Sequence, residues 1–189
     1  MTKSEFRVGE ETLVGQKIGS GKPTILYLHG AGNSTKERGL PIMVKLAEAG
    51  LSIFCFDFSG HGESTGEMKN SSLEKRLSES QAALSFLDDK KPVTVIASSM
   101  AGHIALELVK RCPRVKNLIL FYPAVYATKA FKIPFTEAFS DIIRQPNSWK
   151  DNDVMGSLQQ FTGNLLVIIG GKRQGYSQGS DRDDLLQRE

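Results

Sequence analysis

The chain has 189 residues, of which 40% are hydrophobic and 24% charged, so the composition is that of a folded globular domain and excludes a disordered chain. The formal net charge is only +3, and no basic stretch is interleaved with aromatic residues. A nucleic-acid partner is therefore not expected.

The hydrophobic pattern predicts short strands that alternate with helices. The strands are apolar throughout, which is typical of strands buried on both faces, and the helices have apolar residues three and four positions apart. This alternation predicts βαβ units and a parallel sheet covered by helices on both faces. In chain order we expect an edge hairpin over 6–19, strands over 24–29, 51–57, 93–97, 115–122 and 164–169, and helices over 41–49, 72–87, 104–110, 136–144 and 154–161.

Ser99 lies where the strand 93–97 passes into the next helix. Residues 97–102 read Ala-Ser-Ser-Met-Ala-Gly, so small residues flank Ser99 two positions away on either side, as a sharp strand-to-helix turn requires. Such a turn lifts the Ser99 hydroxyl to the carboxyl edge of the sheet and directs the Met100 N–H to where an oxyanion would form. An ordinary turn capped by Ser98 or Ser99 explains the same residues about equally well.

Two glycine-containing loops follow other predicted strands. One reads His-Gly-Ala-Gly over 29–32, and the other runs from Asp57 to Ser64 with glycines at 60 and 62. The carboxyl ends of parallel strands meet at one edge of a sheet, which is where ligands bind in such folds. We expect both loops and Ser99 to meet there, with Asp57 and Ser64 shaping their turn through hydrogen bonds to the backbone.

Residues 124–162 form an aromatic segment that admits two interpretations. Its aromatic side chains can each anchor the segment to the core, which we favour for most of them individually. The segment as a whole can also form a small lid over Ser99 with an apolar acyl pocket, which we favour for 124–162 taken together. Its aromatic residues include Phe131, Phe135, Phe139 and Trp149.

The three motifs, in this order and each after a strand, resemble those of the α/β-hydrolase superfamily, and most closely the small serine hydrolases related to monoacylglycerol lipases and serine aminopeptidases. The resemblance covers roughly residues 5–172 and implies a three-layer α/β sandwich with a mostly parallel central sheet. It implies Ser99 as the nucleophile and the N–H groups of Ala31 and Met100 as the oxyanion hole. In this family the Asp57 loop is usually architectural, so Asp57, His61 and Ser64 are not expected to be catalytic.

The resemblance also implies a triad acid and a histidine after the strand 164–169, and the sequence departs from it there. Arg173 stands where the family has aspartate, and the three histidines of the chain are His29, His61 and His103. The first two belong to shape-defining loops, and His103 lies one helical turn after Ser99, so none is a strong candidate for the base. Nothing places Lys172 beside Ser99 as an alternative base. By comparison with the family, the last strand and helix of the fold are expected to be missing.

The apolar periodicity stops after Gly170. With one permissible codon set, a single-base shift near codon 173 makes the chain continue from Lys172 as Asp-Lys-Val-Ile-Pro, which restores the acid-bearing turn of the family. We therefore hypothesise a truncated or frameshifted hydrolase, with a hydrolase domain over 1–172 and a non-native or disordered tail over 173–189. A nucleotide sequence in which no single-base shift opens a frame ending in Gly-x-x-His would contradict this.

Together these observations predict a serine hydrolase of small carboxylic esters, thioesters or amides that works through an acyl-enzyme, impaired here by the missing acid and histidine. The alternative is an inactive hydrolase fold that binds a ligand or partner. We expect a small-molecule acyl substrate and neither a metal nor an organic cofactor. The start has no apolar signal segment, no run is long enough to span a membrane, and Cys55 and Cys112 lack metal-ligand spacing, so we expect a reduced cytoplasmic protein. The exposed edge at 164–169 predicts a marginal monomer or a homodimer that covers it.

Overall fold

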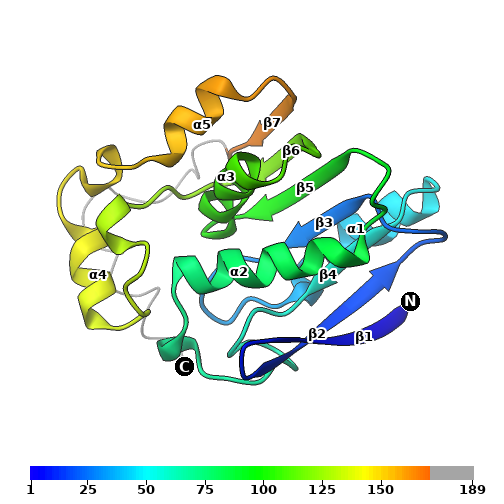
Figure 1. Cartoon of the computed structure of the whole chain (residues 1–189), viewed down its shortest axis with the longest axis horizontal. Helices are drawn as coiled ribbons and strands as arrows, with labels where there is room; N and C mark the ends of the chain where they lie inside the picture. The colour runs from blue at the N-terminus through cyan, green and yellow to red at the C-terminus, as the bar shows by residue number, and fades with distance from the viewer. Residues whose placement is uncertain (171–189) are drawn as a thin grey trace.

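The computed structural model describes residues 1–170, in which one seven-stranded sheet is flanked by helices (Figure 1). The strands are β1 (Thr2–Val8), β2 (Glu11–Ile18), β3 (Ile25–Leu28), β4 (Ile53–Phe56), β5 (Val93–Ser98), β6 (Val115–Phe121) and β7 (Asn164–Ile168). The α-helices are α1 (Leu40–Glu48), α2 (Leu73–Ala83), α3 (Ala101–Arg111), α4 (Glu137–Arg144) and α5 (Val154–Gln160). Short 3₁₀ helices are η1 (Lys36–Gly39), η2 (Met68–Asn70), η3 (Leu84–Phe86), η4 (Thr128–Ala130) and η5 (Ser148–Lys150).

The sheet has the strand order β1-β2-β4-β3-β5-β6-β7. β1 and β2 form an antiparallel hairpin at one edge, β2 is also antiparallel to β4, and all other neighbours are parallel. This confirms the α/β class, the mostly parallel sheet and the edge hairpin. The hairpin begins at Thr2 rather than Phe6, because the polar residues 2–5 pair with β2 through their backbone, which the hydrophobic pattern does not register.

Two helices differ from the hydrophobic pattern at their ends. α3 begins at Ala101, directly after the Ser99 turn, although its apolar spacing becomes clear only from Ile104. The helix predicted over 72–87 is α-helical only to Ala83 and continues as the 3₁₀ turn η3. Ser72 caps α2, since its Oγ accepts the Lys75 N–H at 3.1 Å.

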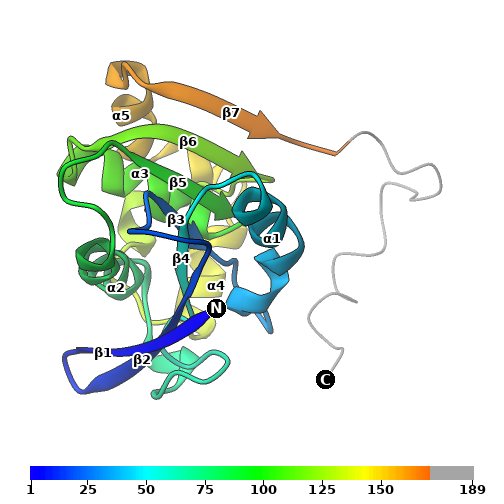
Figure 2. The same ribbon diagram turned by 90° about the vertical axis from the view of Figure 1, so that its right-hand side faces the viewer.

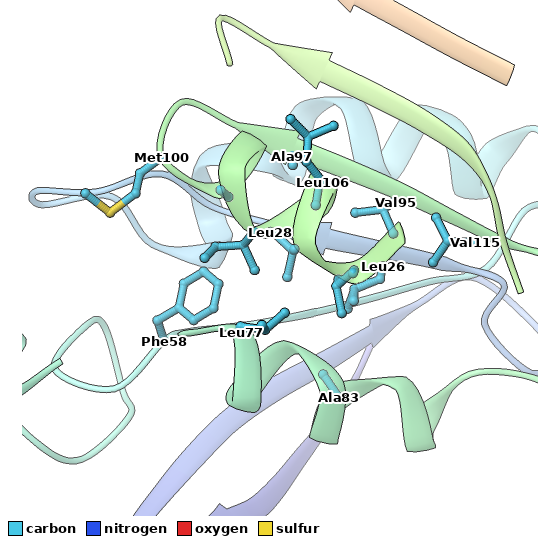
Figure 3. Close-up of a cluster of buried hydrophobic side chains, with 14 of the residues drawn as sticks. Leu26, Leu28, Phe58, Leu77, Ala83, Val95, Ala97, Met100, Leu106 and Val115 are labelled. Carbon is cyan, nitrogen blue, oxygen red and sulfur yellow. The ribbon is translucent and has the colours of Figure 1, made fainter. Parts of the chain in front are cut away.

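Helices lie on both sides of the sheet (Figure 2). On one side, α2 and α3 cover the larger apolar core, in which strand residues such as Leu26 and Val95 face Leu77 and Leu106 of the helices (Figure 3). On the other side, α1 covers a smaller core around Met43. Within the described residues this second side is not covered over β5, β6 and β7, where an apolar groove of about 400 Å³ lies open.

The segment 124–162 packs its aromatic residues against the larger core. Phe139 is buried, and Phe131 and Phe135 are partly buried against the same cluster, which confirms the anchoring interpretation for these three. Trp149 differs, because 56% of its surface is exposed. Figure 1 shows α4 of this segment beyond the carboxyl ends of β3 and β5.

Both cysteines are free thiols, Cys55 buried and Cys112 partly exposed. In the part of the chain that the structure describes, no helix is long and apolar enough to cross a membrane.

A buried ion pair fixes the loop that follows β4. Lys36 Nζ lies 2.6 Å from Asp57 Oδ2 and 2.9 Å from Glu63 Oε2, and the Lys36 N–H donates to Asp57 Oδ1 at 2.7 Å. Ser64 Oγ donates to the Asp57 carbonyl at 2.6 Å, which confirms that Asp57 and Ser64 shape the turn. Gly62 is required beside them, because its φ is +51° and a Cβ there would lie 2.2 Å from Asp57 Oδ2.

We expect Asp57→Asn to lower the free energy of unfolding by about 2–3 kcal/mol, because the buried Lys36 ammonium loses its buried carboxylate partner and keeps only the half-exposed Glu63. Urea denaturation followed by circular dichroism measures the change. Lys3→Met is the control: it breaks the exposed pair with Glu63 and should cost less than about 1 kcal/mol. Equal losses in the two variants would contradict a specific role for the buried pair.

Candidate active site

Ser99 occupies a strained turn between β5 and α3. Its φ is +52°, a left-handed conformation that is rare for a residue with a Cβ, and its side chain is exposed. Backbone hydrogen bonds hold the turn: the Ser99 N–H donates to the Phe121 carbonyl at 2.9 Å, and its own carbonyl accepts the N–H groups of Gly102 and Ala124, each at 2.9 Å. An ordinary helix cap does not require this conformation, so the geometry favours the sharp elbow over the capped turn.

Small residues around Ser99 allow the chain to pack this closely. A Cβ at Gly102 would lie 2.7 Å from Pro123 Cβ, and a Cβ at Gly30 would lie 3.3 Å from Ser99 Cβ. Ala97 and Ala101, two residues on either side of Ser99, are fully buried. Gly30 therefore lets the loop after β3 lie directly against the serine turn, as the strand order predicts.

Two backbone N–H groups at this position are unused within residues 1–170. Neither the Ala31 N–H, in the loop after β3, nor the Met100 N–H, at the start of α3, donates a hydrogen bond to a described residue. Met100 precedes the first residue of an eleven-residue helix, where unpaired N–H groups and the helix dipole favour negative charge. Both N–H groups belong to residues next to the serine turn, and both are free to bind an acceptor that is not part of residues 1–170.

His29 and His61 have both ring nitrogens engaged elsewhere. His29 Nε2 accepts the Phe58 N–H at 3.0 Å and Nδ1 contacts the Gly30 carbonyl at 2.8 Å, while His61 contacts the Ser59 carbonyl at 3.1 Å and Arg76 Nη2 at 3.0 Å. Burial lowers the pKa of His29 well below its ordinary value, and Arg76 adds to this shift. Both rings are structural, in agreement with their assignment to shape-defining loops.

His103 also has a ring nitrogen engaged by a group other than Ser99. It is buried in α3, its Nδ1 accepts the Tyr126 N–H at 3.2 Å, and it lines a pocket of about 370 Å³ with Lys110 and Asp153. Within residues 1–170 no histidine nitrogen is hydrogen-bonded to Ser99. The sequence positions Lys172 and Arg173, considered above as base and acid positions, lie outside the described residues, as does the predicted tail 173–189.

Sequence reasoning missed two buried cations near this site, Lys36 and Arg76. Arg76 has no exposed surface, and Lys36 is almost fully buried. A signal for Arg76 was present, because it lies on the apolar face of α2 between Leu73 and Leu77, where a charged residue is unusual. No cluster of three or more His, Cys, Asp or Glu side chains suited to a metal occurs in the described residues.

The sequence of the chain also matches a known protein family. The sequence model of the family described as "Serine aminopeptidase, S33" matches residues 19–165, which run from before β3 to the first two residues of β7 and include Ala31, Ser99 and Met100. The chain belongs to this family. The motif resemblance and the fold together therefore place it among the α/β-hydrolases.

The chain is similar in sequence to curated proteins and in fold to solved structures. An uncharacterized protein of Mycobacterium tuberculosis (strain H37Rv) is 31% identical over 120 residues, which are 63% of this chain and 34% of that protein. An esterase of Pyrococcus furiosus superposes with a TM-score of 0.65 at 20% identity, covering 89% of this chain and 70% of the other. The thioesterase domain from the curacin biosynthetic pathway gives 0.62 at 24% identity, covering 67% and 46%. Of the curated relatives that it matches in sequence, the chain spans about a third of the length.

The titration of His103 predicts how stability depends on pH. Burial lowers the pKa of His103 to about 4, so the unfolded chain binds a proton near pH 6.5 before the folded chain does. The free energy of unfolding should therefore fall as the pH drops from about 6.5 towards 4, by roughly 3 kcal/mol from this residue. Urea denaturation at several pH values should show a shallower fall for His103→Gln, which stays uncharged. Parallel curves for the two proteins would contradict this.

Proposed function

We propose that the chain is a serine hydrolase of small carboxylic esters, thioesters or amides that forms an acyl-enzyme on Ser99. The observation that carries the proposal is the exposed Ser99 hydroxyl at a left-handed turn, with the unused N–H groups of Ala31 and Met100 beside it. In this proposal Ser99 Oγ attacks the carbonyl carbon and the two N–H groups bind the resulting oxyanion. The motif order supports it, since Ser99 follows the oxyanion loop as in other α/β-hydrolases.

The proposal includes slow turnover by these 189 residues. A serine hydroxyl is almost fully protonated at neutral pH and needs a base, and each histidine of the chain is held by other groups. Oxyanion stabilisation and binding alone can retain about 10³–10⁴-fold acceleration over water when a triad member is missing. A base from a second chain would raise this rate.

We also propose that residues 1–172 form the hydrolase domain and that 124–162 act as a small lid. The place of α4 beyond the carboxyl ends of β3 and β5 supports this, as does the exposed Trp149 at 56%. A reduced cytoplasmic setting is consistent with the two free cysteines. The second candidate function, a ligand- or partner-binding protein without turnover, is favoured by the engagement of all three histidines.

Hydrolysis of p-nitrophenyl acetate and butyrate by the purified chain, beside Ser99→Ala, tests the proposal. We expect a rate above background that falls in Ser99→Ala, because only the acyl-enzyme route needs Ser99; the acceleration from the oxyanion site and binding alone should remain in both proteins. Stoichiometric labelling of Ser99 by a fluorophosphonate gives the same answer without turnover. Equal rates in the two proteins, together with no labelling, would support the binding protein instead.

A further proposal concerns association through β7. Its central side chains, at 165–167, are apolar and exposed, with Leu166 at 52%, and its outer edge pairs with no strand among residues 1–170. Such an edge can pair with another chain, so we propose a homodimer that covers it. Sedimentation velocity should show a concentration-dependent dimer that Leu166→Lys weakens. A heat-resistant monomer at all concentrations would contradict it.

A further inference from the structure

The peptide between Gly30 and Ala31 is held from one side by two buried donors. Its carbonyl oxygen, on Gly30, contacts His29 Nδ1 at 2.8 Å and accepts a hydrogen bond from Arg76 Nη1 at 3.3 Å. The proton of His29 lies on Nδ1, because Nε2 accepts the Phe58 N–H. The C=O and N–H of a trans peptide point in opposite directions, so this anchoring turns the Ala31 N–H away from Arg76 and towards the open side of the loop.

Arg76 is a fully buried cation whose close partners are uncharged. Besides the Gly30 carbonyl, its guanidinium donates to His61 Nε2 at 3.0 Å and lies 4.8 Å and 5.0 Å from the ring centres of Phe58 and Phe135. No carboxylate of the described residues lies within 4.0 Å of it. Burial lowers the pKa of Arg76 to about 10, which leaves the group charged at neutral pH.

A charge buried without an adjacent carboxylate is costly, and Arg76 Nε also lacks a partner among residues 1–170. The location of the Arg76 charge suggests a functional role that offsets this cost. The guanidinium lies on the carbonyl side of the Gly30–Ala31 peptide. The cation, the C=O and the N–H are therefore aligned, and the Ala31 N–H at the other end of the peptide is directed towards the Ser99 side of the loop. A fixed positive potential at that end favours negative charge on a bound oxygen and needs no rearrangement when that charge develops.

We propose that Arg76 is a positioning residue for the oxyanion site: it orients and polarises the Gly30–Ala31 peptide and supplies behind it a positive charge that no carboxylate contacts directly. The inference rests on the proposed hydrolase function, in which Ala31 binds the oxyanion. The neutral carbonyl of a bound ester gains little from this potential, whereas the tetrahedral intermediate gains much. Loss of Arg76 therefore lowers kcat more than it changes KM.

Arg76→Met and Arg76→Lys test this in p-nitrophenyl acetate hydrolysis, with the Ser99→Ala rate subtracted. We expect Arg76→Met to lower kcat by about 10- to 100-fold with KM within about twofold, which is less than the loss of a direct oxyanion donor. Arg76→Lys keeps the charge and should recover part of kcat. Lys75→Met is the matched control: it removes the neighbouring cation of α2, whose Nζ pairs with Glu11 rather than contacting Gly30. It should leave kcat within about twofold.

A second measurement does not depend on turnover or on Ser99. The carbonyl ¹³C resonance of Gly30 and the amide resonance of Ala31 should both move in Arg76→Lys and Arg76→Met and stay in place in Lys75→Met. Unchanged resonances in folded Arg76 variants, or an unchanged kcat, would overturn the inference. If the unsubstituted chain has no Ser99-dependent rate, the proposed function fails, and the two resonances still decide whether Arg76 positions this peptide.

Discussion

The left-handed backbone of Ser99 is the constraint on which the candidate site depends. A residue with a Cβ keeps a φ of +52° only where its surroundings leave no relaxed alternative. Here the carbonyl of Ser99 is held by the N–H groups of Gly102 and Ala124, and its N–H is held by β6. Because β5 is paired with a parallel strand on each side, the sheet itself fixes the point at which the turn begins.

A second constraint joins the two loops around the serine. Arg76 reaches from α2 to the Gly30 carbonyl in one loop and to His61 in the other, and His29 links Gly30 to Phe58. Each loop is thus tied to a helix and to the other loop through buried polar contacts. A network of this kind specifies one arrangement, since an unpaired buried polar group is costly. This gives the histidines of the loops a structural use that competes with acid–base chemistry.

The sequence was sufficient for the fold because period and spacing are local properties. Strand and helix positions, the parallel order and the meeting of the motifs at one edge follow from apolar runs and from the rule that parallel strands end together. Local patterns cannot register contacts between distant residues. The pairing of Lys36 with Asp57, and of Arg76 with Gly30, joins positions 21 and 46 residues apart. The start of β1 was misplaced for a related reason, because its polar residues are held by backbone pairing alone.

The backbone groups and the side chains of the candidate site differ in the same way: the fold positions the first, and distant residues position the second. The groups suited to bind an oxyanion are backbone N–H groups, whose positions follow from the fold, so any chain that builds the elbow and the loop after β3 acquires them together. The base is a side chain, and its position depends on which residues lie opposite the elbow. In this chain the histidines near the elbow are hydrogen-bonded to the backbone of 30, 58, 59 and 126 or to Arg76. Electrostatic stabilisation and proton transfer can therefore be lost separately. In the proposed function, a chain that keeps only the first keeps the weak acceleration that oxyanion binding supplies.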